Sequence, residues 1–168
     1  MTGGEGTMKL GFIGCGNMAQ AMITGILKQN VVSPDELIVS NPHEEKTAKL
    51  KEQFGILTTT DNKKTAKEAE IVVLAVKPQV YPEVIKEIRD EVSTEQIIVT
   101  IAAGVSMAAT ERQFGKEMKI VRVMPNTPAL VGEGMSGLCC NEYVTEEEFD
   151  GCSCRSQRKR TSICLYVY

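Results

Sequence analysis

The chain has 168 residues, of which 42% are hydrophobic and 24% are charged, and its formal net charge is −3. This length predicts one domain, or one domain and a fragment, with a buried core. The weak negative charge does not favour nucleic acid or an anionic membrane as a partner. No apolar run reaches the roughly 18 residues of a membrane span. Residues 1–7 lack the basic and apolar regions of a secretory signal, so they are expected to be a disordered leader.

Five of the six cysteines lie in the last 30 residues. Cys15 lies in a glycine-rich loop, where a disulfide would obstruct a ligand. We therefore expect reduced thiols and a cytoplasmic location. Cys152 and Cys154 have no histidine or second cysteine pair at zinc spacing, so no metal site is expected there.

Strands and helices alternate along the first half of the chain. Residues 8–13 predict a strand, and the apolar positions of residues 17–30 fall on one face of a helix. Asp61 is placed to cap a short polar helix that runs through Glu68. The other elements predicted in this half are strands at 37–39 and 56–59 and a helix at 43–54.

The elements of the second half are clearer. Residues 71–76 are apolar without alternation, as in a strand buried on both faces, and Pro82 suits the first turn of a helix. The remaining predictions are strands at 97–101, 120–124 and 135–140 and a helix at 107–114 that Ser106 can cap. Repeated strand–helix–strand units predict an α/β fold with a doubly wound, mainly parallel sheet, Rossmann-like, in one domain over residues 8–148.

The chain changes character near residue 149. Thr145 and Glu148 fit a capping box, which announces a helix with an apolar stripe, but no such stripe follows. Residues 149–168 instead hold three cysteines and a basic cluster. We expect this atypical tail to replace a continuation lost by frameshift or truncation. The alternative is a genuine short tail that packs as an edge strand at residues 163–168.

The glycine-rich loop follows the first predicted strand and opens the first helix. Gly14 allows a sharp turn, Gly16 lets a pyrophosphate approach the backbone, and Ala19 permits close helix packing. Free N–H groups and the helix dipole would hold the anion. In this context the loop predicts dinucleotide binding, and the alternative is a turn without a ligand. The predicted contacts are Gly14, Cys15, Gly16, Asn17, Met18 and Ala19.

The tip of the second strand separates NAD from NADP. A carboxylate at this tip would bind the ribose 2′-hydroxyl of NAD. This chain has Ser40 and Asn41 there, which can donate to phosphate oxygens, and Lys46 or His43 could add positive charge. NADP is therefore the preferred cofactor, and NAD is the alternative. His43 itself is expected to be an exposed turn residue.

Ligands of doubly wound sheets lie outside the carboxyl ends of the strands. Lys77 is expected to reach cofactor oxygens, with a solvated loop lysine as the alternative. The alternative for Pro78 is simple strand termination. The small residues after the fifth predicted strand would let a ring or ribose approach closely. The cofactor contacts predicted here are Ala75, Val76, Lys77, Pro78, Ala102, Ala103 and Gly104.

Four segments together resemble the pyrroline-5-carboxylate reductases: residues 11–19, 75–79, 100–104 and 121–136. They stand in that family's order and spacing. The resemblance implies reduction of the C=N bond of 1-pyrroline-5-carboxylate to L-proline by NAD(P)H, with NADPH preferred. It also implies that Asn126 and Thr127 lie beside the nicotinamide and the substrate.

No catalytic side chain is predicted. The protein would align the nicotinamide with the imine, and the imine is protonated readily, so a strong acid is less necessary than in carbonyl reduction. The family continues into a helical C-terminal domain that forms the dimer and holds the substrate carboxylate. This chain leaves the pattern there, so we expect impaired turnover, a doubtful homo-oligomer and an exposed apolar patch. The alternatives are an inactive NADP-binding module and another nicotinamide-dependent dehydrogenase of similar domain type.

Overall fold

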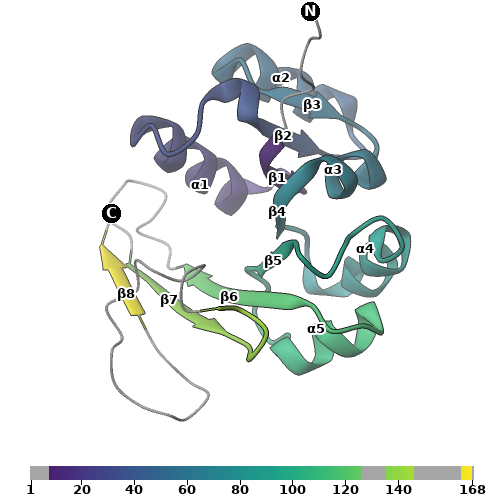
Figure 1. Ribbon diagram of the computed structural model, residues 1–168. Helices are drawn as coiled ribbons and strands as arrows, with labels where there is room; N and C mark the ends of the chain where they lie inside the picture. The colour runs from purple at the N-terminus through teal and green to yellow at the C-terminus, as the bar shows by residue number, and fades with distance from the viewer. Residues whose placement is uncertain (1–7, 126–134, 146–163, 168) are drawn as a thin grey trace, which may run out of the picture.

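A single sheet organises the molecule (Figure 1). The computed structural model describes residues 8–125, 135–145 and 164–167. Within these residues eight strands form one sheet in the order β3-β2-β1-β4-β5-β6-β7-β8. Strands β1 to β6 are parallel to one another, whereas β7 and β8 are antiparallel additions at one edge. This arrangement confirms the predicted doubly wound, mainly parallel sheet.

The elements alternate in chain order. The strands are β1 Met8–Ile13, β2 Leu37–Ser40, β3 Leu57–Thr59, β4 Ala69–Leu74, β5 Ile97–Thr100, β6 Lys119–Pro125, β7 Met135–Cys140 and β8 Cys164–Val167. The helices are α1 Asn17–Lys28, α2 Glu44–Phe54, α3 Asn62–Glu68, α4 Tyr81–Ile88 and α5 Met107–Phe114. Two short 3₁₀ turns, η1 Pro34–Glu36 and η2 Pro78–Val80, precede β2 and α4.

Some boundaries differ from the sequence predictions for local reasons. Helix α1 ends at Lys28 rather than near residue 30, because Asn30 adopts a positive φ of 53° that a helix does not continue through. Strand β4 covers residues 69–74 instead of 71–76, since the last two predicted residues leave the sheet as a loop. Strand β8 matches the edge-strand alternative for the tail, whereas residues 146–163 lie outside the described part of the chain.

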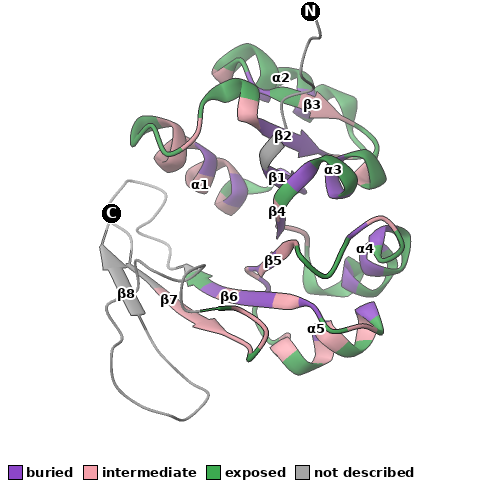
Figure 2. Ribbon diagram, viewed as in Figure 1, coloured by how far each residue is buried: buried purple, intermediate pink, exposed green. Residues whose placement is uncertain are grey.

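The helices cover the two faces of the sheet (Figure 2). Ala19 and Ile23 of α1 pack with Leu50 of α2 against one face. Helices α3, α4 and α5 cover the other face, where Ile85 and Phe114 are buried. The strands between the two layers are apolar on both sides, as expected of a parallel sheet.

Local capping fixes where several helices begin and end. The Asp61 carboxylate accepts hydrogen bonds from the backbone N–H groups of Lys63 and Lys64 at 2.9 and 3.3 Å. The Ser106 hydroxyl accepts one from Ala109 N–H at 3.1 Å. Both caps agree with the sequence prediction. In the described part of the chain no helix combines the length and apolar character needed to cross a membrane.

Candidate cofactor-binding site

The carboxyl ends of β1 and β4 form the switch point of the sheet. From β1 the chain proceeds to β2 on one side, and β4 lies on the other side. Gly14 N–H donates to Ser40 carbonyl at 2.8 Å, and Ala75 N–H donates to Ile13 carbonyl at 2.8 Å. The loops after β1, β2 and β4 are therefore held at one edge of the sheet, which is where doubly wound folds bind ligands.

Gly14 occupies a position that only glycine can fill. Its φ is +100°, and a Cβ atom would lie 2.5 Å from the carbonyl oxygen of Ala75. The predicted sharp turn is therefore present. The close approach of the loop after β4 is a second reason for glycine, and sequence reasoning did not identify it.

Gly16 faces open space at the start of α1. A Cβ atom built on this residue would meet nothing within 4 Å. Gly16 is the N-cap of α1, no side chain caps the helix, and its first turn contains no acidic residue. The leading N–H groups and the positive end of the dipole are thus left to an anion. This arrangement fits the pyrophosphate of a dinucleotide.

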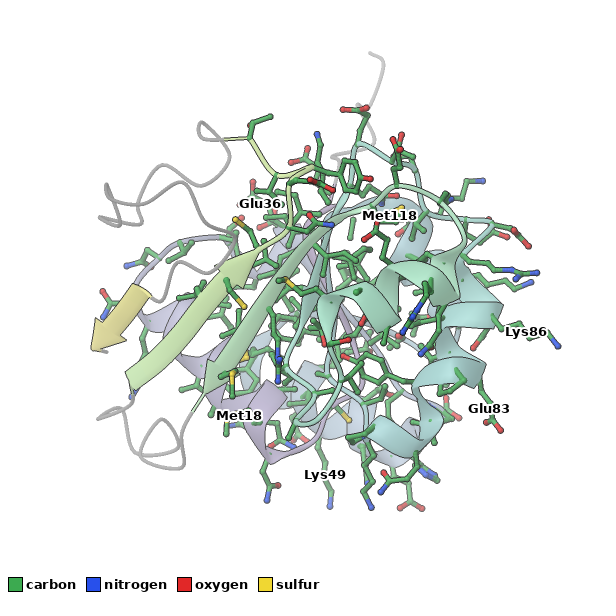
Figure 3. The ribbon with its side chains drawn as sticks, turned by 90° about the horizontal axis from the view of Figure 1, so that it is seen from below. Met18, Glu36, Lys49, Glu83, Lys86 and Met118 are labelled. Atoms are coloured by element: carbon green, nitrogen blue, oxygen red, sulfur yellow. The ribbon has the colours of Figure 1, made fainter. Side chains whose placement is uncertain are left out.

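The neighbouring residues divide between packing and exposure. Ala19 is only 1% exposed and packs α1 onto the sheet, as its small size predicted. Asn17 is exposed and Met18 is half-buried at the beginning of α1. Met18 is labelled in Figure 3. Both residues contribute backbone N–H groups at the helix start, beside Gly16.

The Cys15 side chain points into the core. Cys15 is only 3% exposed. Burial raises the pKa of its thiol, and the positive charge of Lys46 lowers that pKa by a smaller amount. Gln20 Nε2 donates to the Cys15 carbonyl at 3.0 Å and so supports the loop from within α1. Cys15 can therefore contact a ligand through its backbone only. Gln20 was not predicted, because glutamine in a helix carries no distinctive signal.

Ser40 differs from its prediction. The residue is fully buried, and its hydroxyl donates to Asn62 Oδ1 of α3 at 2.8 Å. As the last residue of a strand buried on both faces, its side chain turns inward. The Ser40 hydroxyl therefore ties α3 to the sheet instead of facing a phosphate, and the predicted side-chain contact is corrected to a structural one.

The other polar residues at the tip of β2 remain near the surface. Asn41 is half-buried, and its Oδ1 accepts a hydrogen bond from His43 N–H at 2.9 Å. His43 is exposed, as predicted, and stands at the N-cap of α2. Lys46 is exposed in the first turn of α2, and its charge reaches the Cys15 thiol. The charge of Lys46 is thus close enough to act on the Cys15 thiol in the glycine loop.

The loops after β4 and β5 leave the same edge of the sheet. Ala75 and Val76 are half-buried against Gly14, whereas Lys77 and Pro78 are exposed. After β5, Ala102 is 5% exposed, and Ala103 and Gly104 are open to solvent. Gly104 has a φ of +77°, so its backbone conformation also favours glycine. The two residues predicted beside the substrate, Asn126 and Thr127, lie outside the described residues.

A second surface feature of the described residues lies away from the glycine loop. A shallow groove over α3 and α4 is lined by lysines and carboxylates together, namely Lys63, Glu83, Lys86, Glu87, Asp90 and Glu91. Figure 3 shows Glu83 and Lys86 extending outward from α4. Among the described residues no cluster of histidine, cysteine or carboxylate groups could hold a metal ion.

The fold and the glycine loop define a dinucleotide-binding oxidoreductase domain, and sequence comparison agrees. The chain belongs to the family described as NADP oxidoreductase, coenzyme F420-dependent, whose model matches residues 9–104.

Within this family the chain is similar to pyrroline-5-carboxylate reductases. It is 41% identical to the Escherichia coli protein of that name over 140 residues, which are 83% of this chain and 52% of the relative. The Corynebacterium melassecola protein of the same name is 40% identical over 141 residues. The chain therefore spans about half the length of the curated relatives it matches.

Solved structures give the same grouping. A pyrroline-5-carboxylate reductase from Coxiella burnetii matches with a TM-score of 0.81 and 38% identity, over 86% of this chain and 53% of that one. The Plasmodium falciparum pyrroline carboxylate reductase, solved with NADP bound, matches with a TM-score of 0.75 and 32% identity, over 85% of this chain and 52% of that one. Prephenate dehydrogenase from A. aeolicus is only 13% identical and shares the fold alone.

Proposed function

We propose that this chain is the NADPH-binding domain of a pyrroline-5-carboxylate reductase and acts in the reduction of 1-pyrroline-5-carboxylate to L-proline. The observation that carries the proposal is the 41% identity to the Escherichia coli reductase over 83% of the chain. The open backbone at Gly16, with no capping side chain, supports the cofactor part of the proposal.

The residues of the site have distinct duties in this reaction. The backbone at Gly16, Asn17 and Met18 would hold the pyrophosphate, and the loops at 75–78 and 102–104 would line the path toward the nicotinamide. When bound, the reduced nicotinamide supplies the hydride. The chain's own contribution is to bind, orient and exclude water. His43, the only histidine, lies at the tip of β2 and so belongs to the adenosine end of the site.

The preference for NADPH over NADH rests on the charges at the tip of β2. Residues 40–43 contain no carboxylate that would repel a 2′-phosphate. Asn41 is half-buried there, and the exposed Lys46 carries a positive charge that acts on the glycine loop at Cys15. A charge-assisted contact from Lys46 would favour the phosphorylated ribose.

The partner proposed for this chain is a small-molecule substrate, with neither nucleic acid nor membrane involved. A cytoplasmic location is part of the same proposal, and the free thiols of Cys15, Cys139 and Cys140 support it. A second candidate function is an NADP-binding module without turnover. The turnover assay described below separates that candidate from the reductase.

The test separates binding from turnover. Purified protein is titrated with NADPH and with NADH, and NADPH oxidation is then followed with 1-pyrroline-5-carboxylate as substrate. Binding with turnover supports the reductase, and binding without turnover supports the module. Failure of both nucleotides to bind at millimolar concentration overturns both functions.

A further inference from the structure

Tyr81 places a buried hydroxyl between two loops of the cofactor site. It is the first residue of α4 and is only 1% exposed. Its hydroxyl donates to the carbonyl oxygen of Leu74 at 3.0 Å and lies 2.6 Å from the Thr100 hydroxyl. Leu74 is the last residue of β4, and Thr100 is the last residue of β5.

The direction of each hydrogen bond follows from the number of protons available. Tyr81 has one hydroxyl proton, which goes to the Leu74 carbonyl, so Thr100 donates to the Tyr81 oxygen. The Thr100 oxygen in turn accepts from the N–H of Ala102 at 3.5 Å. A chain of three hydrogen bonds therefore runs from the end of β4, through Tyr81 and Thr100, to the loop after β5.

The hydroxyl pair lies directly beneath residues that would face the cofactor. Leu74 and Thr100 are partners in the parallel register of β4 and β5, and the loops at 75–78 and 102–104 begin immediately after them. The η2 turn at Pro78–Val80 returns the chain so that Tyr81 closes the loop back onto Leu74. Ala75 on this loop also abuts Gly14.

We propose that Tyr81 is a positioning residue for the cofactor site, with its hydroxyl fixing the loop after β4 relative to the loop after β5. The inference rests on the proposed function, because it assigns both loops to the nicotinamide side of the cofactor. A phenylalanine ring would fill the same buried space but could hold neither loop. Burial raises the pKa of Tyr81 to about 12, so the hydroxyl keeps its proton at any physiological pH.

The test compares two probes that occupy different parts of the site. NADPH reaches both loops, whereas 2′,5′-ADP stops at the glycine loop and the tip of β2. Loss of one net hydrogen bond in Tyr81→Phe should weaken NADPH about fivefold to tenfold and leave 2′,5′-ADP within about twofold. Thr100→Val should behave in the same way, whereas Thr100→Ser keeps the hydroxyl and should retain the wild-type affinities.

Ile88→Val serves as the matched control for a general loss of stability. Ile88 is fully buried on the same helix, near the end far from the loops. This variant should leave the ratio of the two affinities unchanged. The proposal is overturned if Tyr81→Phe weakens both probes equally, or if Ile88→Val shifts the ratio as much as Tyr81→Phe does.

Amide hydrogen exchange on the ligand-free chain gives a readout that needs no nucleotide. In Tyr81→Phe the amides of Ala102 and Ala103 should exchange faster than in the wild type, while the amide of Asn41 at the tip of β2 is unchanged. If the exchange rate at Ala102 is unchanged, the proposal that Tyr81 joins the two loops is overturned. If the wild-type chain binds neither probe, the proposed function fails, and the exchange result alone decides whether Tyr81 joins the two loops.

Discussion

At the scale of single residues, the two leading glycines of the loop serve opposite purposes. Gly14 is required because a side chain there would clash with the carbonyl oxygen of Ala75, whereas Gly16 leaves open the space that we propose for the pyrophosphate. A sequence pattern treats the two positions alike. The structure separates them because a Cβ atom is excluded by protein at one position and by nothing within 4 Å at the other.

This difference predicts opposite outcomes for the same substitution. Gly14→Ala introduces a clash and a positive φ, so it should lower the free energy of unfolding by about 3 kcal/mol. Gly16→Ala should cost less than about 1 kcal/mol but weaken NADPH at least about tenfold, since the methyl group fills space for the pyrophosphate. Urea unfolding and nucleotide titration measure the two effects. If Gly16→Ala bound NADPH with wild-type affinity, the glycine loop would not be part of the NADPH site.

A second residue-scale prediction concerns Tyr81 and pH. Burial raises the pKa of Tyr81 from 10.0 to about 12, and the hydrogen bond from Thr100 offsets part of the rise. The folded chain therefore holds this proton more tightly than the unfolded chain. The contribution of the protonated hydroxyl to the free energy of unfolding, about 3 kcal/mol, is fully present below pH 10 and is lost as the pH rises through about 12.

The measurement is urea unfolding of wild type and Tyr81→Phe across the alkaline range. The free energy of unfolding should fall more steeply for the wild type, because only that chain titrates at position 81. Below about pH 9 the two curves should run parallel. Curves that stay parallel throughout the alkaline range would contradict a buried, proton-retaining hydroxyl.

At the scale of elements, the packing of α3 against β1 depends on Gly11. A Cβ atom there would lie 2.7 Å from the Ala69 Cβ and 2.9 Å from the Thr65 Cγ2. Gly11→Ala should therefore push α3 away from the sheet and lower stability by about 1–3 kcal/mol. Adding Ala69→Gly removes the nearer contact and should restore part of the loss.

Gly25→Ala provides the control for this prediction. Gly25 lies inside α1, and a Cβ atom there meets nothing within 4 Å. The same substitution should therefore raise stability by up to about 1 kcal/mol through helix propensity. Urea midpoints are measured for Gly11→Ala, for Gly11→Ala combined with Ala69→Gly, and for Gly25→Ala. Equal losses of stability for Gly11→Ala and Gly25→Ala would refute the packing argument.

The elements also show what the sequence could predict. The Asp61 and Ser106 caps were predictable, because each joins residues two or three positions apart. The Tyr81–Thr100 bond joins residues 19 apart, and the Ser40–Asn62 bond joins residues 22 apart. Such pairs meet only once strand order and register are fixed, and one sequence does not contain that information. For this reason Ser40 was expected to face a ligand and instead binds α3.

Tyr81 did carry one unused signal. Its position continues the apolar stripe of α4 through Val84, Ile85 and Ile88 at helical spacing. That stripe places Tyr81 inside the core, where a hydroxyl needs a partner. The existence of a partner was thus predictable, whereas its identity was not.

At the scale of the whole molecule, strand order explains why distant segments share one site. Six parallel strands place every strand-to-helix loop at the same edge of the sheet. The loops at 14–19, 75–78 and 102–104 consequently face one region although they are far apart in the sequence. The alternation of strands and helices, together with right-handed crossovers, predicted that these loops lie at one edge of the sheet. The strand at 135–140, β7, was predicted, but its antiparallel pairing was not. For β8 an edge strand was only the alternative prediction from the sequence.

Because the site is assembled by the whole sheet, a nucleotide that binds it should stabilise the entire domain. At about one hundred times its dissociation constant, NADPH should add about 2.7 kcal/mol. For a chain of this size that gain raises Tm by about 5–10 °C. Thermal unfolding followed by circular dichroism measures the shift. Gly16→Ala, which binds NADPH at least about tenfold more weakly, should show no more than about half of this shift at the same concentration. An equal shift for wild type and Gly16→Ala would mean that NADPH binds elsewhere on the molecule.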